Sequence, residues 1–387
     1  MGSLLSLWQD EKRRAVLLQA LAVVAVMGFI GWVASNTISN LEKQNLASGF
    51  DFMDEVAGFG VTQSLIDYSE TSTYGRAFWV GLLNTLLVAV VGVILATVLG
   101  FVIGVGRLSS NWLVRNLSAT YVELIRNVPL LLQIFFWYFG VLKQLPSPKE
   151  SIAPLEGVFL NIRGLYMPRP VGEEGFAVVL IVGLLAIIGT FFLIRWARLR
   201  QQATGQTFPA FAVGLAGGAL LVGVTYMIMG APLSSEMPQA SRFNVRGGMR
   251  VVPEFVALVL ALSIYTASFI AEIVRSGIEA VPKGQWEAAQ ALGLSRGRTL
   301  RLVVIPQALR VIVPPLTSQY LNLTKNSSLA VAIAYPDLVS VFAGTTLNQT
   351  GQAVEIIAVT MAVYLTISIS TSLAMNRFNS AIALKER

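Results

Sequence analysis

Eight long apolar runs constrain the fold of this chain more than any other feature of its sequence. Each is about 20 residues or longer, the length that a helix needs to cross roughly 30 Å of hydrocarbon. The runs lie near 15–35, 78–106, 119–143, 176–194, 210–231, 252–276, 307–334 and 353–375. The sequence therefore predicts an all-α, polytopic integral membrane protein with about eight transmembrane helices.

The composition agrees with this prediction. Charged residues make up only 13% of the chain, whereas a soluble domain of ordinary makeup has roughly 25%. The 33 glycines fit as well, because transmembrane helices tolerate glycine and use it for close packing. The first run follows Lys12, Arg13 and Arg14, as the core of a signal peptide would, but it is too long for such a core. We expect a retained helix there.

Two residue types are absent, and their absence limits the chemistry. The chain has no Cys and no His, so it can form neither disulfides nor thiolate metal sites, and it lacks the base of a His-dependent catalytic triad. It also lacks the G-x-x-x-x-G-K-[ST] pattern with which a P-loop binds ATP. We expect no catalytic residue, no metal and no cofactor in this chain.

Charged residues alternate in sign from one predicted loop to the next. Cytoplasmic loops of membrane proteins carry an excess of Lys and Arg, which gives the orientation. Cations concentrate in the segments 1–14, 107–118, 195–209, 277–306 and 376–387. Most acids lie in the segments 36–77, 144–175, 232–251 and 335–352. We therefore place both termini in the cytoplasm, and we interpret the net charge of +7 as an orientation signal rather than as a nucleic-acid surface.

A short polar stretch, EAAQALGLSRGRTLRLVVIP at 287–306, lies on the predicted cytoplasmic side. Pro282 and Gly284 mark a turn before it. The residues from Gln285 to Leu292 then predict a short helix that Gly293 ends in a left-handed cap. We expect this helix to fit a socket on a partner protein, because its alanines allow close approach.

The same loop supplies one fixed negative charge and several cations. Glu287 would meet a basic group, while Ser295 is placed to cap the next helix and Pro306 to lead the chain back into the membrane. The cations that we expect near lipid headgroups or a partner's acids are Arg296, Arg298 and Arg301. An ordinary interfacial helix remains the alternative.

The pattern of this loop resembles the EAA loop of permease subunits in ABC importers. The matching positions are Glu287, Ala288, Ala289, Gly293, Val303, Ile305 and Pro306. In that family the loop forms a coupling helix that docks into a groove of the cytoplasmic ATPase subunit. The resemblance implies a type I ABC importer permease core, in which the ATPase-coupling residues would be Glu287, Ala288, Ala289, Gly293, Arg296 and Pro306.

Three further stretches narrow the resemblance. Residues 121–140, 265–295 and 323–333 are similar to the polar amino-acid uptake group, including the general L-amino-acid and glutamate/glutamine/aspartate importers. This implies an amino-acid substrate, a location in the bacterial inner membrane, and no enzymatic activity in this chain. The implied partners are ATPase subunits that hold ATP and Mg²⁺, a second homologous permease chain in a heterodimer, and an extracytoplasmic amino-acid-binding protein.

The resemblance also suggests how the chain is divided. Residues 1–76 would form an N-terminal transmembrane helix and an outer loop. The permease core would comprise 77–145 and 251–387, with the EAA loop at 279–306. Residues 146–250 would be an insertion with an outer loop and two extra helices, and they carry no motif that indicates a function.

Polar residues in the middle of the seventh run indicate a transport path. Lys325 lies deep in that run, where a charged side chain costs on the order of 2.5–3.5 kcal/mol. Its ammonium would attract a substrate carboxylate, or else would pair with an acid on the second permease chain. The residues assigned to the substrate pathway are Lys325, Asn326, Ser327, Ser328, Tyr265, Ser268 and Glu272.

Other charged and special residues within the spans have simpler interpretations. Glu123 and Arg126, and likewise Glu272 and Arg275, have the i,i+3 spacing of helical ion pairs, and we expect each to pair at the cytoplasmic interface. Pro129 predicts a kink in the third span. The glycines of GFVIGVG, at 100–106, indicate helix packing, because this stretch follows no strand.

Two other classes of membrane protein fit the sequence less well than an importer permease. A self-sufficient secondary transporter is disfavoured, because intramembrane acids are scarce and no matching pair of interrupted segments is visible. A purely structural anchor would leave the polar seventh span unexplained. The sequence thus favours the permease subunit of an amino-acid ABC importer.

Overall fold

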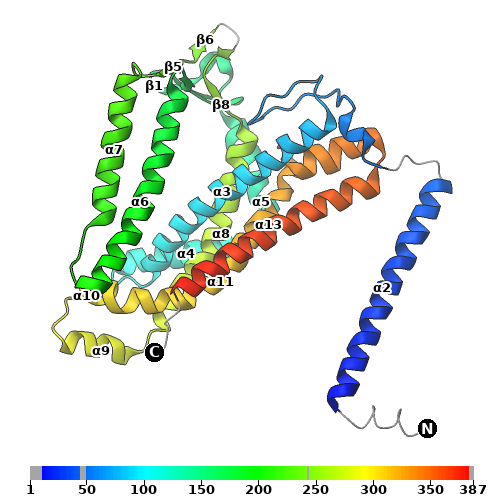
Figure 1. The fold of residues 1–387 in the computed structure, drawn as a ribbon. Coiled ribbons are helices and arrows are strands. Elements are labelled where there is room, and N and C mark those ends of the chain that lie inside the picture. The colour runs from blue at the N-terminus through cyan, green and yellow to red at the C-terminus, as the bar shows by residue number, and fades with distance from the viewer. Residues whose placement is uncertain (1–10, 44–48, 242–243, 383–387) are drawn as a thin grey trace, which may run out of the picture. The chain divides into compact units, whose positions relative to one another are not determined.

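The computed structural model describes residues 11–43, 49–241 and 244–382, and these form two compact units (Figure 1). Unit 1 comprises Met1–Ile134 and Leu258–Arg387, and unit 2 comprises Phe135–Ala257. The chain passes between the units within two helices, α5 (Leu130–Phe135) and α8 (Pro253–Glu279). The predicted insertion at 146–250 lies inside unit 2.

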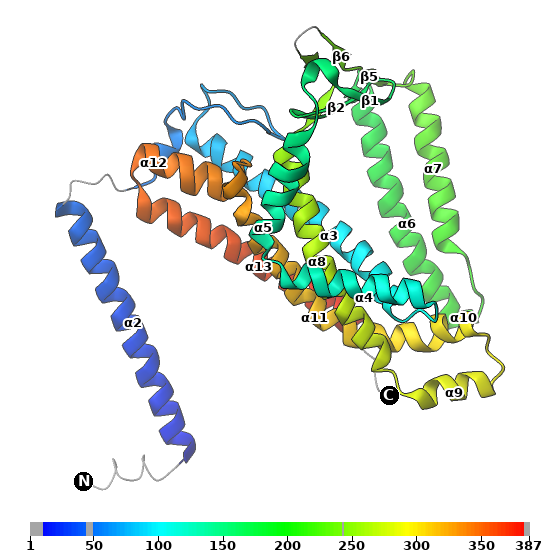
Figure 2. The ribbon, with the colours of Figure 1, turned by 180° about the vertical axis from the view of Figure 1, so that it is seen from behind.

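Unit 1 consists of helices, with η marking 3₁₀ or π segments. Its longest helix in the core is α3 (Tyr74–Arg107), which Thr73 caps by accepting a hydrogen bond from the Arg76 amide at 3.2 Å. The other elements, several of them visible in Figure 2, are α2 (Glu11–Lys43), η1 (Asp51–Asp54), α4 (Trp112–Asn127), α9 (Lys283–Ala291), α10 (Arg296–Thr299), η5 (Leu300–Val304), α11 (Ile305–Asn326), η6 (Ser327–Ile333), η7 (Val339–Thr346), α12 (Leu347–Thr350) and α13 (Ala353–Ile382).

Glycines bring α3 close to α8, as the sequence predicted for GFVIGVG. A Cβ atom added at Gly100 would lie 2.6 Å from the Ile270 side chain, and one at Gly104 would lie 2.7 Å from the Ala271 carbonyl oxygen. Gly100 and Gly104 are one turn apart and therefore lie on the same face of α3. The helix-packing interpretation is confirmed at these two positions.

The third predicted span is broken. Trp112–Asn127 and Leu130–Gln144 are two helical pieces bent by 105° at Val128 and Pro129, so the chain bends at the predicted proline, but the helix is interrupted there rather than kinked. Asn111 caps α4 by accepting from the Leu113 amide at 2.9 Å. The residue before a proline disfavours the α conformation, and Val128 is extended, with ψ of 127°, so the helix ends there.

Unit 2 contains the helical hairpin of α6 (Phe176–Thr204) and α7 (Ala210–Ile228), together with short strands that the sequence did not predict. Its short helical segments are η2 (Phe136–Val141), η3 (Leu142–Gln144) and η4 (Pro148–Glu150). A four-stranded antiparallel sheet has the order β1 (Ile152–Leu155), β2 (Val158–Asn161), β3 (Gly164–Met167) and β8 (Met249–Val251). Two-stranded pairs join β4 (Arg169–Gly172) to β5 (Leu233–Glu236), and β6 (Gln239–Ala240) to β7 (Val245–Arg246).

These strands connect the two chain segments that flank the hairpin. Tyr166 pairs with Arg250 and Arg169 with Glu236, so residues before α6 are hydrogen-bonded to residues after α7. Gly164 has φ of +130°, and a Cβ atom there would lie 2.3 Å from the Val251 carbonyl oxygen, so only glycine fits. The extra segment is therefore a helical hairpin whose two flanking chain segments are joined by small sheets.

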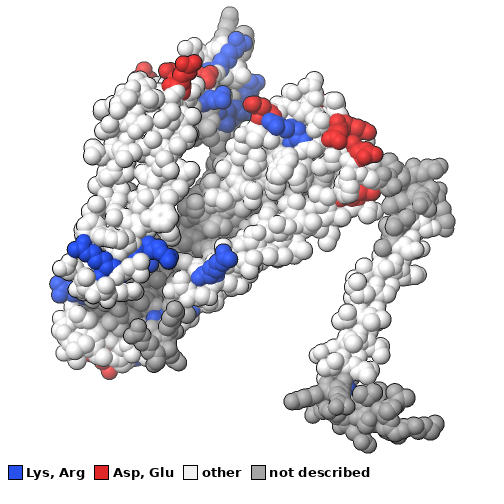
Figure 3. Space-filling view, in the orientation of Figure 1, with Lys and Arg blue, Asp and Glu red and all other residues white. Residues whose placement is uncertain are grey.

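The helices have the lengths and compositions that a membrane requires. Among the described residues, seven helices are long and apolar enough to span, and the bent pair raises the number to eight. The prediction of a mostly helical, polytopic protein is confirmed. In Figure 3 the faces of α6 and α7 are free of charged side chains between their ends, as expected for helices in contact with hydrocarbon.

Candidate coupling and transport site

The predicted coupling helix is α9, which runs from Lys283 to Ala291. Gly293 has φ of +72°, and the Leu294 amide donates to the Ala289 carbonyl at 3.1 Å while the Gly293 amide donates to Gln290 at 2.9 Å. These bonds form a Schellman cap, which satisfies carbonyls that would otherwise lack donors at the end of the helix. The predicted left-handed cap is confirmed.

One face of α9 is anchored to the rest of unit 1. Ala289 is 3% exposed, and the Gln307 side-chain amide donates to the Gln285 Oε1 atom at 3.1 Å, which ties α9 to α11. A hollow of about 320 Å³ between α9 and α10 is lined by Trp286, Gln290, Arg296 and Thr299. Trp286 and this hollow were not identified from the sequence.

The opposite face of α9 is open. Glu287 and Ala288 are exposed, and Leu292 is 81% exposed at the end of the helix. A large apolar side chain this exposed, beside a carboxylate and small residues, suits a protein contact. The predicted coupling residues of α9 therefore lie on two different faces: Ala289 is buried against unit 1, whereas Glu287 and Ala288 are exposed.

The chain continues from this loop into the membrane as one helical run. Ser295 occupies the N-cap position of α10, but its side chain makes no capping hydrogen bond. From Arg296 the helical run extends through η5 and α11 to Ile333, and Pro306 lies in the first turn of α11. Pro306 therefore lies in a helical run that α10 and the π segment η5 already begin, where the chain leads into the predicted span.

Lys325 lies near the end of this run, where α11 changes to the 3₁₀ segment η6. Its side chain is exposed, and among the described residues its ammonium has no ion pair or hydrogen-bond partner. The Ser327 hydroxyl donates to the Thr324 carbonyl and the Ser328 hydroxyl to the Lys325 carbonyl, both at 2.7 Å. Both alternatives for Lys325, a substrate carboxylate or a partner's acid, fit an exposed and unpaired ammonium.

The pathway residues on α8 form a separate group. Ser268 is fully buried, and its hydroxyl donates to the Tyr265 carbonyl at 2.6 Å. Among the described residues, no hydrogen bond or ion pair joins Tyr265, Ser268 or Glu272 to the group at Lys325. Their place in a common pathway therefore remains a prediction.

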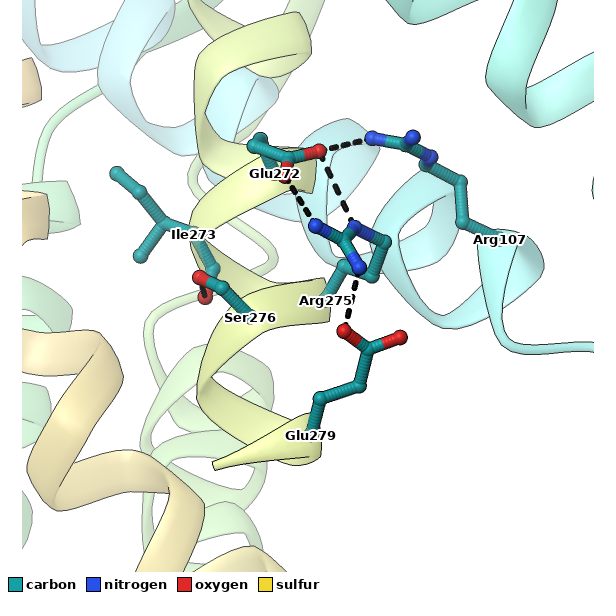
Figure 4. A network of polar contacts seen from close by, with 6 residues as sticks. All are labelled: Arg107, Glu272, Ile273, Arg275, Ser276 and Glu279. Carbon is teal, nitrogen blue, oxygen red and sulfur yellow. Dashed lines mark hydrogen bonds and ion pairs between the residues drawn. The ribbon is translucent and has the colours of Figure 1, made fainter. Parts of the chain in front are cut away.

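Glu272 belongs to an ion-pair network near the C-terminal end of α8 (Figure 4). Its carboxylate accepts from the Arg275 Nη2 atom at 2.5 Å and from Arg107 of α3, and Arg275 also pairs with Glu279. The expected pair of Glu272 and Arg275 is confirmed. Arg107 was not foreseen as its partner, because only the packing of α3 against α8 brings the two together.

The other expected pair does not form. Among the described residues, Glu123 and Arg126 make no ion pair with each other; the Arg126 guanidinium lies over the Phe269 ring instead, 4.9 Å from its centroid. Arg126 is exposed, and a guanidinium over an aromatic face at an exposed site contributes about 0.5–1 kcal/mol. This contact joins α4 to α8.

A buried polar cluster between the spans was also missed. Asp337 is fully buried, its Oδ1 atom accepts from the Ser340 amide at 2.8 Å, and its Oδ2 atom has no hydrogen-bond partner among the described residues. Beside it, the Asn84 side-chain amide donates to the Pro336 carbonyl at 2.9 Å and the Leu338 amide donates to Thr85 at 3.0 Å. Burial raises the pKa of the Asp337 carboxyl to about 7.

This pKa gives a prediction for stability against pH. The folded protein holds the Asp337 proton more tightly than the unfolded chain, so stability falls as the pH rises from about 4 to about 7. Over this pH range the free energy of unfolding should fall by up to roughly 4 kcal/mol. Asp337→Asn should remove this fall, which thermal unfolding in detergent at pH 5 and pH 8 would measure. Asp67→Asn, at an exposed acid, should keep the pH dependence of the wild type; a fall that persists in Asp337→Asn would contradict the prediction.

Comparisons with known proteins decide which family this arrangement belongs to. Residues 203–384 match the family described as binding-protein-dependent transport system inner membrane component. The chain is 55% identical over 377 residues to the putative amino-acid ABC transporter permease protein YhdX of Escherichia coli, covering 97% of this chain and 95% of YhdX. The chain belongs to this permease family. It is a transport subunit, as the sequence predicted, and a self-sufficient transporter is not favoured.

A second relative of the permease is equally similar. The general L-amino acid transport system permease protein AapQ of Rhizobium johnstonii is 55% identical over 381 residues, covering 98% of this chain and 94% of AapQ. Among solved structures, an amino acid ABC transporter matches with a TM-score of 0.47 and 21% identity, covering 80% of the permease and 95% of that chain. As an ABC importer subunit, the permease works with an ATPase and a binding protein.

Proposed function

We propose that this permease imports polar or general L-amino acids and that α9 couples it to a separate ATPase subunit. The observation that carries the coupling role is the division of α9 into an anchored face and an open face. Glu287, Ala288 and Leu292 are exposed, whereas Ala289 is buried and Gln285 is tied to α11. The names of YhdX and AapQ support the amino-acid substrate.

The connection from α9 to Lys325 suggests how the ATPase would move the transport path. The loop leads through the Schellman cap into the helical run Arg296–Ile333, and that run carries Lys325 near its far end. A push on α9 would therefore be transmitted to α11 through the Gln285–Gln307 hydrogen bond and the cap. Closure of the ATPase dimer would switch a cavity between inward and outward access.

The proposal includes an orientation and a set of partners. Asp51 and Asp54 lie in η1, in the segment that precedes α3, and Arg107 ends α3. This distribution supports an outer loop before α3 and a cytoplasmic end after it, in the inner membrane and with both termini in the cytoplasm. A second homologous permease chain would complete the pathway as a heterodimer. ATP and Mg²⁺ would bind to the ATPase subunits, and an extracytoplasmic amino-acid-binding protein would deliver the substrate.

The partners can be tested by purification from native membranes in mild detergent, with mass spectrometry of the proteins that remain bound. We expect a P-loop ATPase and a second permease in stoichiometric amounts. A chain that purifies alone, and that transports amino acids alone after reconstitution, would contradict the proposal and restore the secondary-transporter alternative.

Lys325→Met separates the two roles of this ammonium. If Lys325 binds the substrate carboxylate, the loss of a charged hydrogen bond of roughly 1.5–3 kcal/mol should raise the KM for uptake by about 10-fold to 150-fold, with partners retained. If Lys325 pairs with the second permease, that chain should be lost on purification. Lys325→Arg keeps the charge and should retain most uptake. Normal KM and normal partners in Lys325→Met would exclude both roles.

A further inference from the structure

The α6–α7 hairpin of unit 2 exposes apolar side chains along most of its length. Ile187 is 70% exposed, Phe191 64% and Leu215 62%. The two helices pack closely through small residues: a Cβ atom added at Gly214 would lie 2.5 Å from Thr190, and one at Gly218 would lie 3.3 Å from Ala186. The small residues thus form the contact between α6 and α7, and the large apolar side chains of both helices face away from that contact.

A groove of about 560 Å³ runs along the hairpin. On α6 it is lined from Gly183 to Ile194, and on α7 from Phe211 to Val222. Thr190 is the polar side chain in this lining, and its hydroxyl donates to the Ala186 carbonyl at 2.8 Å. The groove therefore offers no free hydrogen-bonding side chain among its lining residues, and an occupant must present an apolar surface to it.

The length of the groove matches one leaflet of a bilayer. The lining on α6 spans 11 residue steps, which at 1.5 Å per residue is about 17 Å. Half of a hydrocarbon core of about 30 Å is about 15 Å. A single acyl chain that stands upright in one leaflet would fill the groove from end to end.

Two arginines follow at the Ile194 end of the groove. Arg195 and Arg198 lie one helical turn beyond the lining residues Phe191 and Ile194, so they continue the same face of α6. Both side chains are exposed, and neither makes an ion pair with any described residue. In contrast, the Arg200 guanidinium donates to the Gln206 Oε1 atom at 2.8 Å.

Aromatic side chains lie at the same level. The Trp196 and Phe208 rings meet edge to face at 5.7 Å, and Arg200 stacks over Trp196 at 5.4 Å. Trp and Tyr are typical of the membrane–water interface, where their rings lie among the headgroups. Along α6 the apolar groove is therefore followed by a level at which cations and aromatic rings lie together, as the acyl chain of a phospholipid is followed by its glycerol and phosphate.

We propose that this groove binds one acyl chain of an anionic phospholipid, whose phosphate is held by Arg195 and Arg198. Charge complementarity favours a lipid over a transmembrane helix of a partner, because every phospholipid carries its phosphate at the level where these two cations lie. The proposal rests on the geometry of the hairpin and is independent of the substrate and of α9.

Native mass spectrometry of the purified transporter, delipidated and then titrated with phosphatidylglycerol in detergent, would test the site. Two variants test the two parts of the site, the arginines and the apolar groove. Arg195→Gln/Arg198→Gln removes the cations, and Gly183→Leu fills the groove at a position where an added Cβ atom has its nearest neighbour 3.9 Å away. Arg246→Gln/Arg250→Gln removes two exposed cations elsewhere in unit 2 and serves as the matched control.

We expect phosphatidylglycerol binding to fall by about 10-fold in each test variant, as the loss of roughly 1.4 kcal/mol implies, and to stay unchanged in the control. Phosphatidylcholine should bind less strongly than phosphatidylglycerol to the wild type. Equal binding by all variants, each eluting as a folded complex, would overturn the proposal. A benzophenone side chain at Ile187 that crosslinks to a polypeptide instead of lipid would also overturn it, in favour of a partner helix.

Discussion

Glu287→Arg should abolish ATP-dependent uptake while leaving the permease folded and in the membrane. Glu287 is exposed on the open face of α9, so the substitution disturbs no packing within this chain. Reversing a charge at a protein contact removes one ion pair and creates a repulsion, which together cost roughly 2–5 kcal/mol of binding free energy. Binding of the ATPase should weaken by about 30-fold or more, so that the ATPase is lost during purification.

Uptake of radiolabelled amino acids and the ratio of ATPase to permease in the purified complex would be measured together. Glu156→Arg is the matched control. Glu156 is also exposed, in the turn between β1 and β2 of unit 2, and its substitution changes the charge by the same amount. The control should transport normally. Normal uptake and a normal ATPase ratio in Glu287→Arg would remove the coupling role of α9.

Local features of the sequence predict α9 and its C-terminal cap well. A turn at Pro282, a short run rich in alanine and a glycine at 293 are signals that act within a few residues, and α9 has the expected cap. The seven long helices follow from apolar length alone in the same way. The functional roles of Glu287 and Lys325 depend on partner chains, so they remain proposals.

Features that depend on distant contacts could not be predicted. The strands of unit 2 are two to four residues long, and their partners lie up to about 85 residues away in sequence, as with Tyr166 and Arg250, so no periodic pattern reveals them. Arg107 meets Glu272 only because α3 packs on α8. The break at Val128 was underestimated, because a proline within an apolar run permits either a kink or a helix end.

The contact between α3 and α8 links the close packing of these helices to the charged residues near their C-terminal ends. Gly100, Gly104 and Arg107 follow one another at spacings of four and three residues, so one face of α3 carries both the close approach and the ion pair. Arg107 can reach Glu272 only while the glycines keep the two backbones close. Separating the helices should therefore also break the ion-pair network around Glu272.

Gly100→Ala/Gly104→Ala should destabilise the permease strongly for this reason. The added Cβ atoms would lie 2.6 Å from Ile270 and 2.7 Å from the Ala271 carbonyl oxygen, and a backbone atom cannot move aside without moving α8. Overpacking typically costs 1–3 kcal/mol at each site, which exceeds the gain of up to about 1 kcal/mol in helix propensity from glycine to alanine. We expect a lower unfolding temperature in detergent and a loss of uptake in proportion to the folded fraction.

Gly189→Ala makes the same glycine-to-alanine change at a position without close neighbours, and there it should not lower stability. Gly189 lies within α6, and a Cβ atom there would have no neighbour within 4 Å, so only the gain in helix propensity remains. Its unfolding temperature should equal or slightly exceed that of the wild type. If the double variant were as stable as Gly189→Ala, then α3 and α8 would not be in close contact, and the Arg107–Glu272 pair would need another explanation.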